Sequence, residues 1–358
     1  MDLTFLGTAS CFPLPSRGVS CIVFRRDGEC WMFDCGEGSQ IQIHESNIKP
    51  GKLTKIFITH LHGDHLFGLP GLMCTIGQTS SEKELPLELY GPTGLRKYIR
   101  VSLELSRSML GFDYVVHELS VPEEELPEDW ETWHPKHTAD TGPVHPNEKE
   151  GRLIKPDENG VWHCCETNQM KVMAAPITHR IPSFGFVLHE KPQPGKLDPQ
   201  KLKDRGVPPG PLYAKIKNGE AIITEAGETI RPDDVLGPKR PGRKIVILGD
   251  TSCNSKIAAI SRNADVLVHE ATLENELREK CVGNGHSTPE MAAEFANDIN
   301  ARKLILTHFS QRYRPAAHEL KEGEESVTKL LEQAKRVFIN KDLIAAEDLM
   351  QVSIPAKK

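Results

Sequence analysis

The chain has 358 residues, and its 38% content of hydrophobic residues suffices to bury a full core. It contains no apolar run long enough to cross a bilayer, and we expect no membrane partner. The formal net charge of −6 argues mildly against a surface coated by nucleic acid. Residues 123–131 hold six acidic side chains in nine positions, however, so the rest of the chain can still carry a basic face.

The start of the chain and its cysteines bear on the cellular compartment. Residues 3–7 read as a strand that enters a glycine turn, without the basic or Arg-rich start of a signal or transit peptide. The nine cysteines are scattered without CxxC pairs, which favours free thiols in a reducing compartment and not a zinc-cysteine site. We therefore expect the cytosol, the nucleus or both.

Short apolar runs rich in β-branched residues predict buried strands at 55–59, 244–248, 265–268 and 303–307. Each run leads into a potential ligand, in turn His60, Asp250, His269 and His308. A capping box with a proline at residues 287–290 predicts a helix start, and we expect a last helix over 324–337. The pattern predicts an α/β layered protein whose site lies along one edge of its sheets.

Two segments depart from this pattern. Residues 120–168 are acidic and rich in Pro and His, which predicts a surface insertion. Residues 190–242 are rich in Pro, Gly and Lys, and seven Lys/Arg between 191 and 219 face only two Asp. Such a basic excursion indicates a partner, with a solvated loop as the alternative. With no internal repeat and no clear second domain, we expect residues 1–358 to form one domain.

The stretch Thr-His-Leu-His-Gly-Asp-His at residues 59–65 carries the chemistry. A divalent transition metal prefers neutral imidazole and carboxylate ligands presented by a rigid loop, and one loop cannot complete two coordination shells. The candidate ligands in the loop are His60, His62, Asp64 and His65, and those that follow other strands are His179, Asp250 and His308. The alternative, a chance surface cluster, fits poorly with three His and an Asp in six positions.

The stretch 60–65 resembles the HxHxDH motif of the metallo-β-lactamase superfamily, whose fold is an αββα sandwich. More narrowly, the chain is similar to the short form of the ribonuclease Z family, the tRNA 3′-processing endonucleases. The similarity covers nearly the whole chain, including residues 5–8, 33–38, 60–72, 179–186, 206–213, 249–251, 269–272, 286–288 and 307–313.

The resemblance implies two zinc ions per subunit. The first would bind His60, His62, His179 and Asp250, and the second would bind Asp64, His65, Asp250 and His308, with Asp250 as the bridge. Asp34 would steady the motif loop, or it caps a turn in the alternative interpretation.

The family's reaction would be cleavage of precursor tRNA after the discriminator base, which leaves a 3′-hydroxyl on the tRNA. Two metals can lower the pKa of water and offset charge on a phosphodiester. Asp64 would orient or deprotonate the water, and His286, paired with Glu270, would protonate the leaving sugar oxygen. Ser287 would contact phosphate at a helix start; the alternative is a plain helix cap beside an ordinary histidine.

The resemblance also gives the basic segment a role. Residues 191–236 match a flexible arm extruded from the core that grips tRNA, often across a homodimer. Lys196, Lys201 and Lys203 would contact phosphates there. Arg312 and Tyr313 would hold RNA near the cut, with a salt bridge and a packed ring as the alternatives.

Other functions share part of these features. A thioester or lactam hydrolase of the same superfamily would use residues 60–65 but has no use for a basic arm. A phosphodiesterase acting on other RNA 3′ ends, such as cyclic phosphates, would keep the nuclease fold. A non-enzymatic RNA-binding scaffold predicts lost ligands, and all seven are present.

Overall fold

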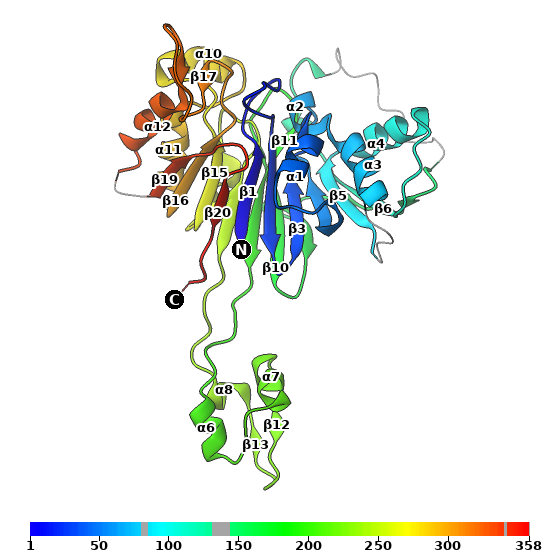
Figure 1. The fold of residues 1–358 in the computed structure, drawn as a ribbon, viewed down its shortest axis with the longest axis vertical. Helices are drawn as coiled ribbons and strands as arrows, with labels where there is room; N and C mark the ends of the chain where they lie inside the picture. The colour runs from blue at the N-terminus through cyan, green and yellow to red at the C-terminus, as the bar shows by residue number, and fades with distance from the viewer. Residues whose placement is uncertain (80–84, 131–143, 340–341, 358) are drawn as a thin grey trace. The chain divides into compact units, whose positions relative to one another are not determined.

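Two β-sheets packed face to face, with helices on their outer faces, form the main body of the chain (Figure 1). This computed structural model describes residues 1–79, 85–130, 144–339 and 342–357. The layers confirm the predicted αββα sandwich. Among the described residues, no helix is both long and apolar enough to span a membrane.

The first sheet runs in the order β20-β1-β2-β3-β4-β5-β6-β7, and β8 also pairs with β6. Its strands β1 to β3 are antiparallel, whereas β3 to β6 are parallel and carry their carboxyl ends to one edge. The strands are β1 (Asp2–Gly7), β2 (Cys21–Arg26), β3 (Glu29–Phe33), β4 (Leu53–Phe57), β5 (Leu87–Pro92), β6 (Tyr114–Leu119), β7 (Glu148–Lys149), β8 (Leu153–Ile154) and β20 (Gln351–Ser353).

The second sheet runs in the order β19-β16-β15-β14-β11-β10-β9. Its strands β14, β15, β16 and β19 are parallel, so their carboxyl ends also share one edge. The strands are β9 (Trp162–Glu166), β10 (Met170–Ile177), β11 (Ser183–Glu190), β14 (Lys244–Ile247), β15 (Val266–Glu270), β16 (Lys303–Thr307) and β19 (Asp342–Ala345). The four strands expected from the sequence are β4, β14, β15 and β16.

Helices cover both sheets on the outside. Helix α11 begins at the predicted capping box, where the hydroxyl of Thr288 accepts from the Met291 amide, and α12 lies within the predicted 324–337. The elements are α1 (Ser39–Glu45), η1 (Pro50–Lys52), α2 (Gly63–Leu66), α3 (Leu69–Thr79), α4 (Leu95–Leu105), η2 (Glu123–Glu125), η3 (Ser255–Ile257), α9 (Ala258–Ser261), η4 (Asn275–Leu277), α10 (Arg278–Gly283), α11 (Pro289–Asp298) and α12 (Val327–Lys335), with β17 (Tyr313–Arg314) and β18 (Glu325–Ser326) as a short pair.

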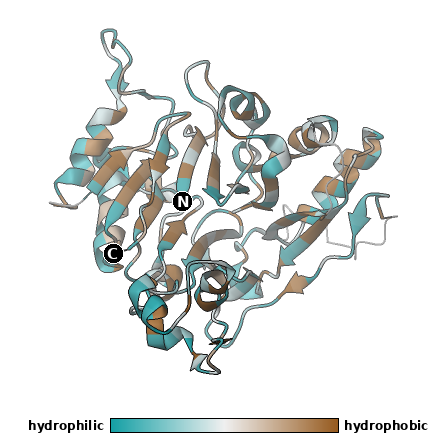
Figure 2. Cartoon of the chain, turned by 60° about the horizontal axis from the view of Figure 1, so that its bottom comes forward, coloured by the Kyte–Doolittle hydropathy of each residue, from teal (hydrophilic) through white to brown (hydrophobic). Residues whose placement is uncertain are grey.

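Aromatic rings fill the space between the sheets. Phe33 and Phe57 of the first sheet stack with ring centroids 4.9 Å apart, and Phe186 of the second sheet lies 5.3 Å from Phe57. All three are buried, and Figure 2 shows hydrophobic residues gathered along the strands and hydrophilic residues on the outer helices. This packing fixes the two sheets against each other and therefore aligns the edges where the parallel strands end.

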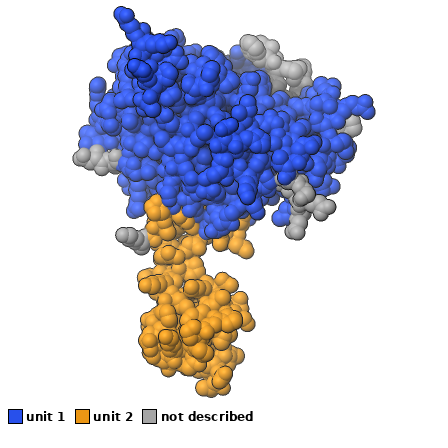
Figure 3. All heavy atoms as spheres, viewed as in Figure 1, with its two compact units in different colours: residues 1–166, 171–188, 244–354 blue, residues 167–170, 189–243, 355–358 orange. Residues whose placement is uncertain are grey.

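Residues 167–170, 189–243 and 355–358 form a second compact unit (Figure 3). It holds α6 (Pro199–Asp204), α7 (Pro211–Lys217), α8 (Pro232–Val235) and the hairpin of β12 (Ile222–Ile223) and β13 (Thr229–Ile230). Its own buried cluster includes Leu202, Ile216, Ile230 and Val235. A solvated loop would not bury such side chains, so the basic segment is a folded unit.

The acidic segment 120–168 is only partly a surface insertion. Its described residues include η2, and they add β7 and β8 to the first sheet and β9 to the second. Residues 131–143 of this predicted insertion lie outside the described residues.

Candidate metal centre

The motif loop leaves the first sheet after β4 and is held by Asp34, which follows β3. The carboxylate of Asp34 accepts hydrogen bonds from the amide of Thr59 at 2.7 Å and from its hydroxyl at 2.9 Å. His60 follows and is fully buried. His62 is the N-cap residue of α2, which places Asp64 and His65 in its first turn. Asp34 thus has the steadying contacts that the resemblance implied.

The other candidate ligands come from the second sheet. His179 follows β10, Asp250 follows β14 and His308 follows β16. A Cβ atom on Gly249 would lie 2.6 Å from the Cβ of Thr59, so only glycine lets the Asp250 loop approach the motif loop this closely. The packed sheets therefore bring ligands of both strand edges together.

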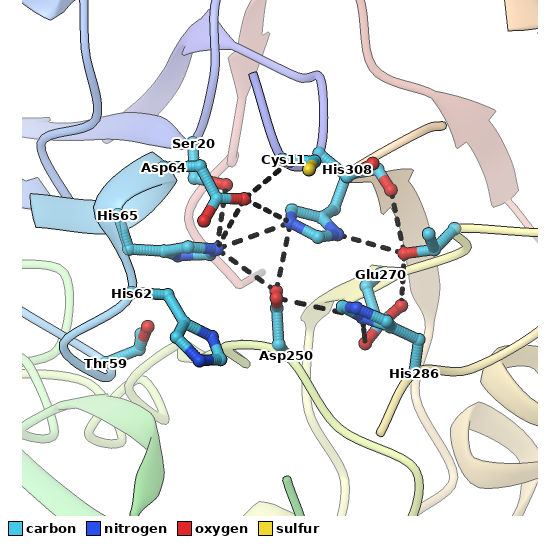
Figure 4. A network of polar contacts seen from close by, with 12 residues as sticks. Cys11, Ser20, Thr59, His62, Asp64, His65, Asp250, Glu270, His286 and His308 are labelled. Carbon is cyan, nitrogen blue, oxygen red and sulfur yellow. Dashed lines mark hydrogen bonds and ion pairs between the residues drawn. The ribbon is translucent and has the colours of Figure 1, made fainter. Parts of the chain in front are cut away.

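The seven predicted ligands lie in two overlapping groups, within which the donor atoms are at most 4.8 Å apart. One group contains His60, His62, His179 and Asp250, and the other contains Asp64, His65, Asp250 and His308. Figure 4 shows Asp250 between the histidines.

The two carboxylate oxygens of Asp250 face different groups. Its Oδ1 lies 3.2 Å from the Nε2 atoms of both His65 and His308. Its Oδ2 lies 3.7 Å from Nε2 of His60 and 3.9 Å from Nε2 of His179. A carboxylate placed in this way can bridge two metal ions.

The ring nitrogens of four histidines test whether metals fit. In each of these side chains, Nδ1 lies within hydrogen-bond distance of a protein oxygen, and such contacts orient metal-bound histidines. The pairs are His60 with Thr59 at 3.0 Å, His65 with Asp34 at 2.7 Å, His179 with the Gly285 carbonyl at 2.7 Å, and His308 with Thr272 at 2.9 Å. Their Nε2 atoms face the cluster, and Nε2 of His60 is buried without a hydrogen-bond partner in the described structure. An inward lone pair of this kind is what a metal ion requires.

Electrostatics agree with this assignment. Burial, together with the neighbouring histidines, lowers the pKa of His60 well below its ordinary value, and burial beside His179 lowers the pKa of His62 to about 4. Burial alone would raise the pKa of Asp250, but His308 and His65 hold it well below its ordinary value. His60 and His62 thus supply neutral imidazoles and Asp250 an ionised carboxylate, the ligand forms that metals bind. His65 differs: burial lowers its pKa, but the carboxylates of Asp250, Asp64 and Asp34 outweigh burial and raise it well above its ordinary value, so a metal ion would displace a proton there.

His286 lies beside this cluster and contacts Glu270. Its Nδ1 donates to Oε1 of Glu270 at 3.0 Å and lies 3.7 Å from Oδ2 of Asp250. Glu270 is held by the amide of Thr251 at 2.7 Å and by the hydroxyl of Thr272. Burial lowers the pKa of His286, but the charges of Glu270 and Asp250 outweigh it and raise the pKa to about 9. His286 is therefore protonated near neutral pH and can donate a proton.

The predicted substrate residues have different surroundings. Arg312 lines a cavity of about 650 Å³ over the metal centre. Ser287 is buried, and its hydroxyl donates to the Thr251 carbonyl at 2.6 Å. The ring of Tyr313 is buried as well, and its hydroxyl accepts from the Glu274 amide at 3.0 Å, as in the packed-ring alternative. Lys196, Lys201 and Lys203 are exposed in the second unit.

Two residues at the centre were not singled out from the sequence. Arg180 lines the cavity, and the amide of Cys11 donates to Oδ2 of Asp64 at 2.6 Å. The position of Arg180 directly after the ligand His179 was a usable signal. Nothing in the pattern around Cys11 indicated its contact, because it depends on the fold of the amino-terminal loop.

The layered fold and the paired ligand groups define a metallohydrolase of the metallo-β-lactamase type. Family models agree: one described as "Beta-lactamase superfamily domain" matches residues 233–309, and one described as "Anti-Pycsar protein Apyc1" matches residues 1–109.

Individual relatives match over the whole length. The zinc phosphodiesterase ELAC protein 1 of Bos taurus is 50% identical over 369 residues, which cover 100% of this chain and 99% of the relative. A ribonuclease Z of Prochlorococcus marinus is 37% identical and covers 99% of both chains. The crystal structure of human tRNase Z, short form, matches with a TM-score of 0.68 and 37% identity over 99% of this chain and 100% of that one. The chain belongs to the ribonuclease Z family.

Proposed function

We propose that this chain is a zinc-dependent endoribonuclease that removes 3′ trailers from precursor tRNA. The cut would fall after the discriminator base and leave a 3′-hydroxyl on the tRNA. The observation that carries the proposal is the carboxylate of Asp250, which faces one ligand group with each oxygen and has the His286–Glu270 pair beside it. The full-length similarity to enzymes named zinc phosphodiesterase and ribonuclease Z supports this substrate class.

Two zinc ions per subunit are part of the proposal. His60, His62 and His179 would hold one, Asp64, His65 and His308 the other, and Asp250 both. Bound there, the ions would lower the pKa of water and neutralise charge on the phosphodiester. The inward Nε2 of His60 and the Nδ1 contacts of the other ligands support this arrangement.

The remaining chemistry falls to side chains of the chain. Asp64, whose Oδ2 accepts from the Cys11 amide, would orient the attacking water. As the oxygen of water bonds to phosphorus, the bond from phosphorus to the 3′ oxygen of the discriminator breaks, and the phosphate stays on the trailer. Because Nδ1 of His286 is bound to Glu270, its Nε2 would give a proton to that 3′ oxygen. Arg312, in the cavity, would hold a phosphate.

Recognition of tRNA would draw on the second unit. Its lysines at positions 196, 201 and 203 are exposed and would bind phosphates in a salt-dependent way. The homodimer implied by the resemblance stays a prediction, which sedimentation of the zinc-loaded chain would measure. The nine free cysteines support a reducing compartment, and we propose the cytosol or the nucleus.

The role of His286 can be tested with a modified scissile bond. We expect His286→Ala to slow cleavage of a normal precursor by about 10²-fold or more, because proton donation contributes that much. A precursor with sulfur in place of the bridging 3′ oxygen carries a leaving group that needs no proton. The same variant should therefore cleave it at nearly the parent rate.

The matched control is His163→Ala, which removes an exposed histidine paired with Asp157 at 2.9 Å and should behave as the parent with both substrates. An equal loss on oxygen and sulfur linkages would remove His286 from the proton-donor role. Should the parent chain ignore the precursor but open a 2′,3′-cyclic phosphate or hydrolyse a thioester, the metal centre would stand and the substrate assignment would fail.

A further inference from the structure

A second pocket adjoins the metal cavity. It encloses about 590 Å³, a volume typical of small-ligand sites. His62 and Arg180 line both this pocket and the metal cavity, so the two spaces border each other at a candidate metal ligand. The mechanism above makes no use of this space.

The walls of the pocket are largely apolar. They include Leu61, Pro92, Val121, Leu126, Trp130 and Pro182. Leu61 comes from the motif loop, between His60 and His62, and Pro182 follows closely after the ligand His179. The pocket is therefore built on the same two loops that present the metal ligands.

The wall formed by residues 121–130 is anchored at several points. The amide of Ser120 donates to the Ile154 carbonyl at 2.9 Å, and Nε1 of Trp162 donates to the Ser120 carbonyl at 3.1 Å. Glu125 forms an ion pair with Lys256 at 2.6 Å. Contacts at Ser120, just before the wall, and at Glu125 in its middle therefore tie it to the main body.

The side chains that line the second pocket indicate what kind of ligand it can bind. Apolar side chains and the indole of Trp130 suit a planar, uncharged ring, which stacks on aromatic side chains regardless of its identity. Asp129 lines the same pocket, and the neighbouring Glu128 is exposed, so a phosphate would meet like charge there. The exposed Arg180 at the junction carries the opposite charge. A base inside the pocket would match the apolar lining, and its phosphate at the junction would match the positive charge of Arg180.

We propose that this pocket binds the base of an unpaired nucleotide next to the scissile phosphate, with Trp130 as the stacking surface and Arg180 against the phosphate. This proposal rests on the proposed ribonuclease function. The nucleotide is either the discriminator or the first residue of the trailer, since both flank the cut.

The test removes the base of one nucleotide beside the cut from the RNA and the indole ring of Trp130 from the protein. Precursor tRNAs with an abasic ribose at the discriminator or at the first trailer position are cleaved by the zinc-loaded parent, Trp130→Ala and Trp130→Phe. Stacking on an aromatic side chain is strong enough that its loss should raise KM by about tenfold or more. We expect this loss for the parent with one of the two abasic substrates. Trp130→Ala should raise KM to the same extent with the normal precursor. It should cause no further rise with the abasic substrate that the parent binds poorly. Trp130→Phe keeps an aromatic ring and should restore most of the affinity for the normal precursor.

A variant that fills the pocket guards against a trivial loss of folding. Leu126→Trp adds bulk to the wall and should raise KM for the normal precursor but not for the affected abasic one, with zinc content equal to that of the parent. Additive losses from the abasic site and the Trp130 change, or no loss from either, would overturn the pocket assignment. Failure of the parent to cut any precursor would instead overturn the proposed function, so the two outcomes are distinct.

Discussion

One hydroxyl links the proposed proton donor to a metal ligand. Oγ1 of Thr272 donates to Oε2 of Glu270 and accepts from Nδ1 of His308 at 2.9 Å. The first contact orients the carboxylate that holds His286, and the second fixes the tautomer in which Nε2 of His308 is open to a metal. Thr272 thus acts through its neighbours, as a positioning residue.

Replacement of this hydroxyl by a methyl group tests the link. We expect Thr272→Val to lower kcat for precursor cleavage by roughly 10- to 100-fold and to weaken zinc retention, since partners of metal ligands have effects of that size. Thr272→Ser keeps the hydroxyl and should remain near the parent. Native mass spectrometry would count the zinc ions beside the kinetics. A valine variant with parental kcat and zinc content would show that the hydroxyl is dispensable.

At the scale of elements, Asp348 joins the turn between β19 and β20 to two amino-terminal segments. Its carboxylate accepts from the Thr8 hydroxyl at 2.7 Å, the Gly18 amide at 2.6 Å and the Gln42 side chain at 2.7 Å. Asp348→Ala leaves these donors without their acceptor, which should lower the free energy of unfolding by about 2–3 kcal/mol. Urea denaturation would measure the change.

A surface aspartate of the same region serves as the control. Asp342 is half exposed and pairs with Lys303 at 2.8 Å. Because exposed ion pairs contribute little, Asp342→Ala should cost about 0–1 kcal/mol. Similar costs for the two variants would mean that Asp348 is not a structural junction.

Sequence patterns located the elements that bear the site but not everything they contact. The strands before His60, Asp250 and His308 were predicted because their apolar runs are continuous and end in polar residues. The burial of Ser287 and Tyr313 could not be read from neighbours in the chain, since their partners Thr251 and Glu274 are 36 and 39 positions away. Hydrogen bonds over such separations depend on how the sheets pack.

Weak local patterns also explain why residues 120–168 and 190–242 contain strands and helices that the sequence did not predict. Strands β7 and β8 have two residues each, too short for a period of two to appear. The second unit buries only a small set of apolar residues, spaced among prolines, glycines and lysines. Local patterns are weak wherever a fold is made of very short elements.

For the whole molecule, charge in the second unit sets the expected response to salt. Reversal of Lys196, Lys201 and Lys203 to glutamate should raise KM for precursor tRNA and reduce the slope of log KM against log salt by about one for each phosphate that the variant no longer binds. Lys335→Glu in α12, where the lysine pairs with Glu332 at 2.6 Å, is the control in the main body. If the triple variant kept the parental slope, these lysines would not bind phosphate.

The most direct test of the central claim is end mapping of a 3′-extended precursor tRNA after incubation with the zinc-loaded chain. We predict one cut after the discriminator, a 3′-hydroxyl on the tRNA, a 5′-phosphate on the trailer, and loss of cleavage when zinc is removed by a chelator. A cut elsewhere, a 3′-phosphate, or cleavage that survives complete removal of the metal would contradict the account.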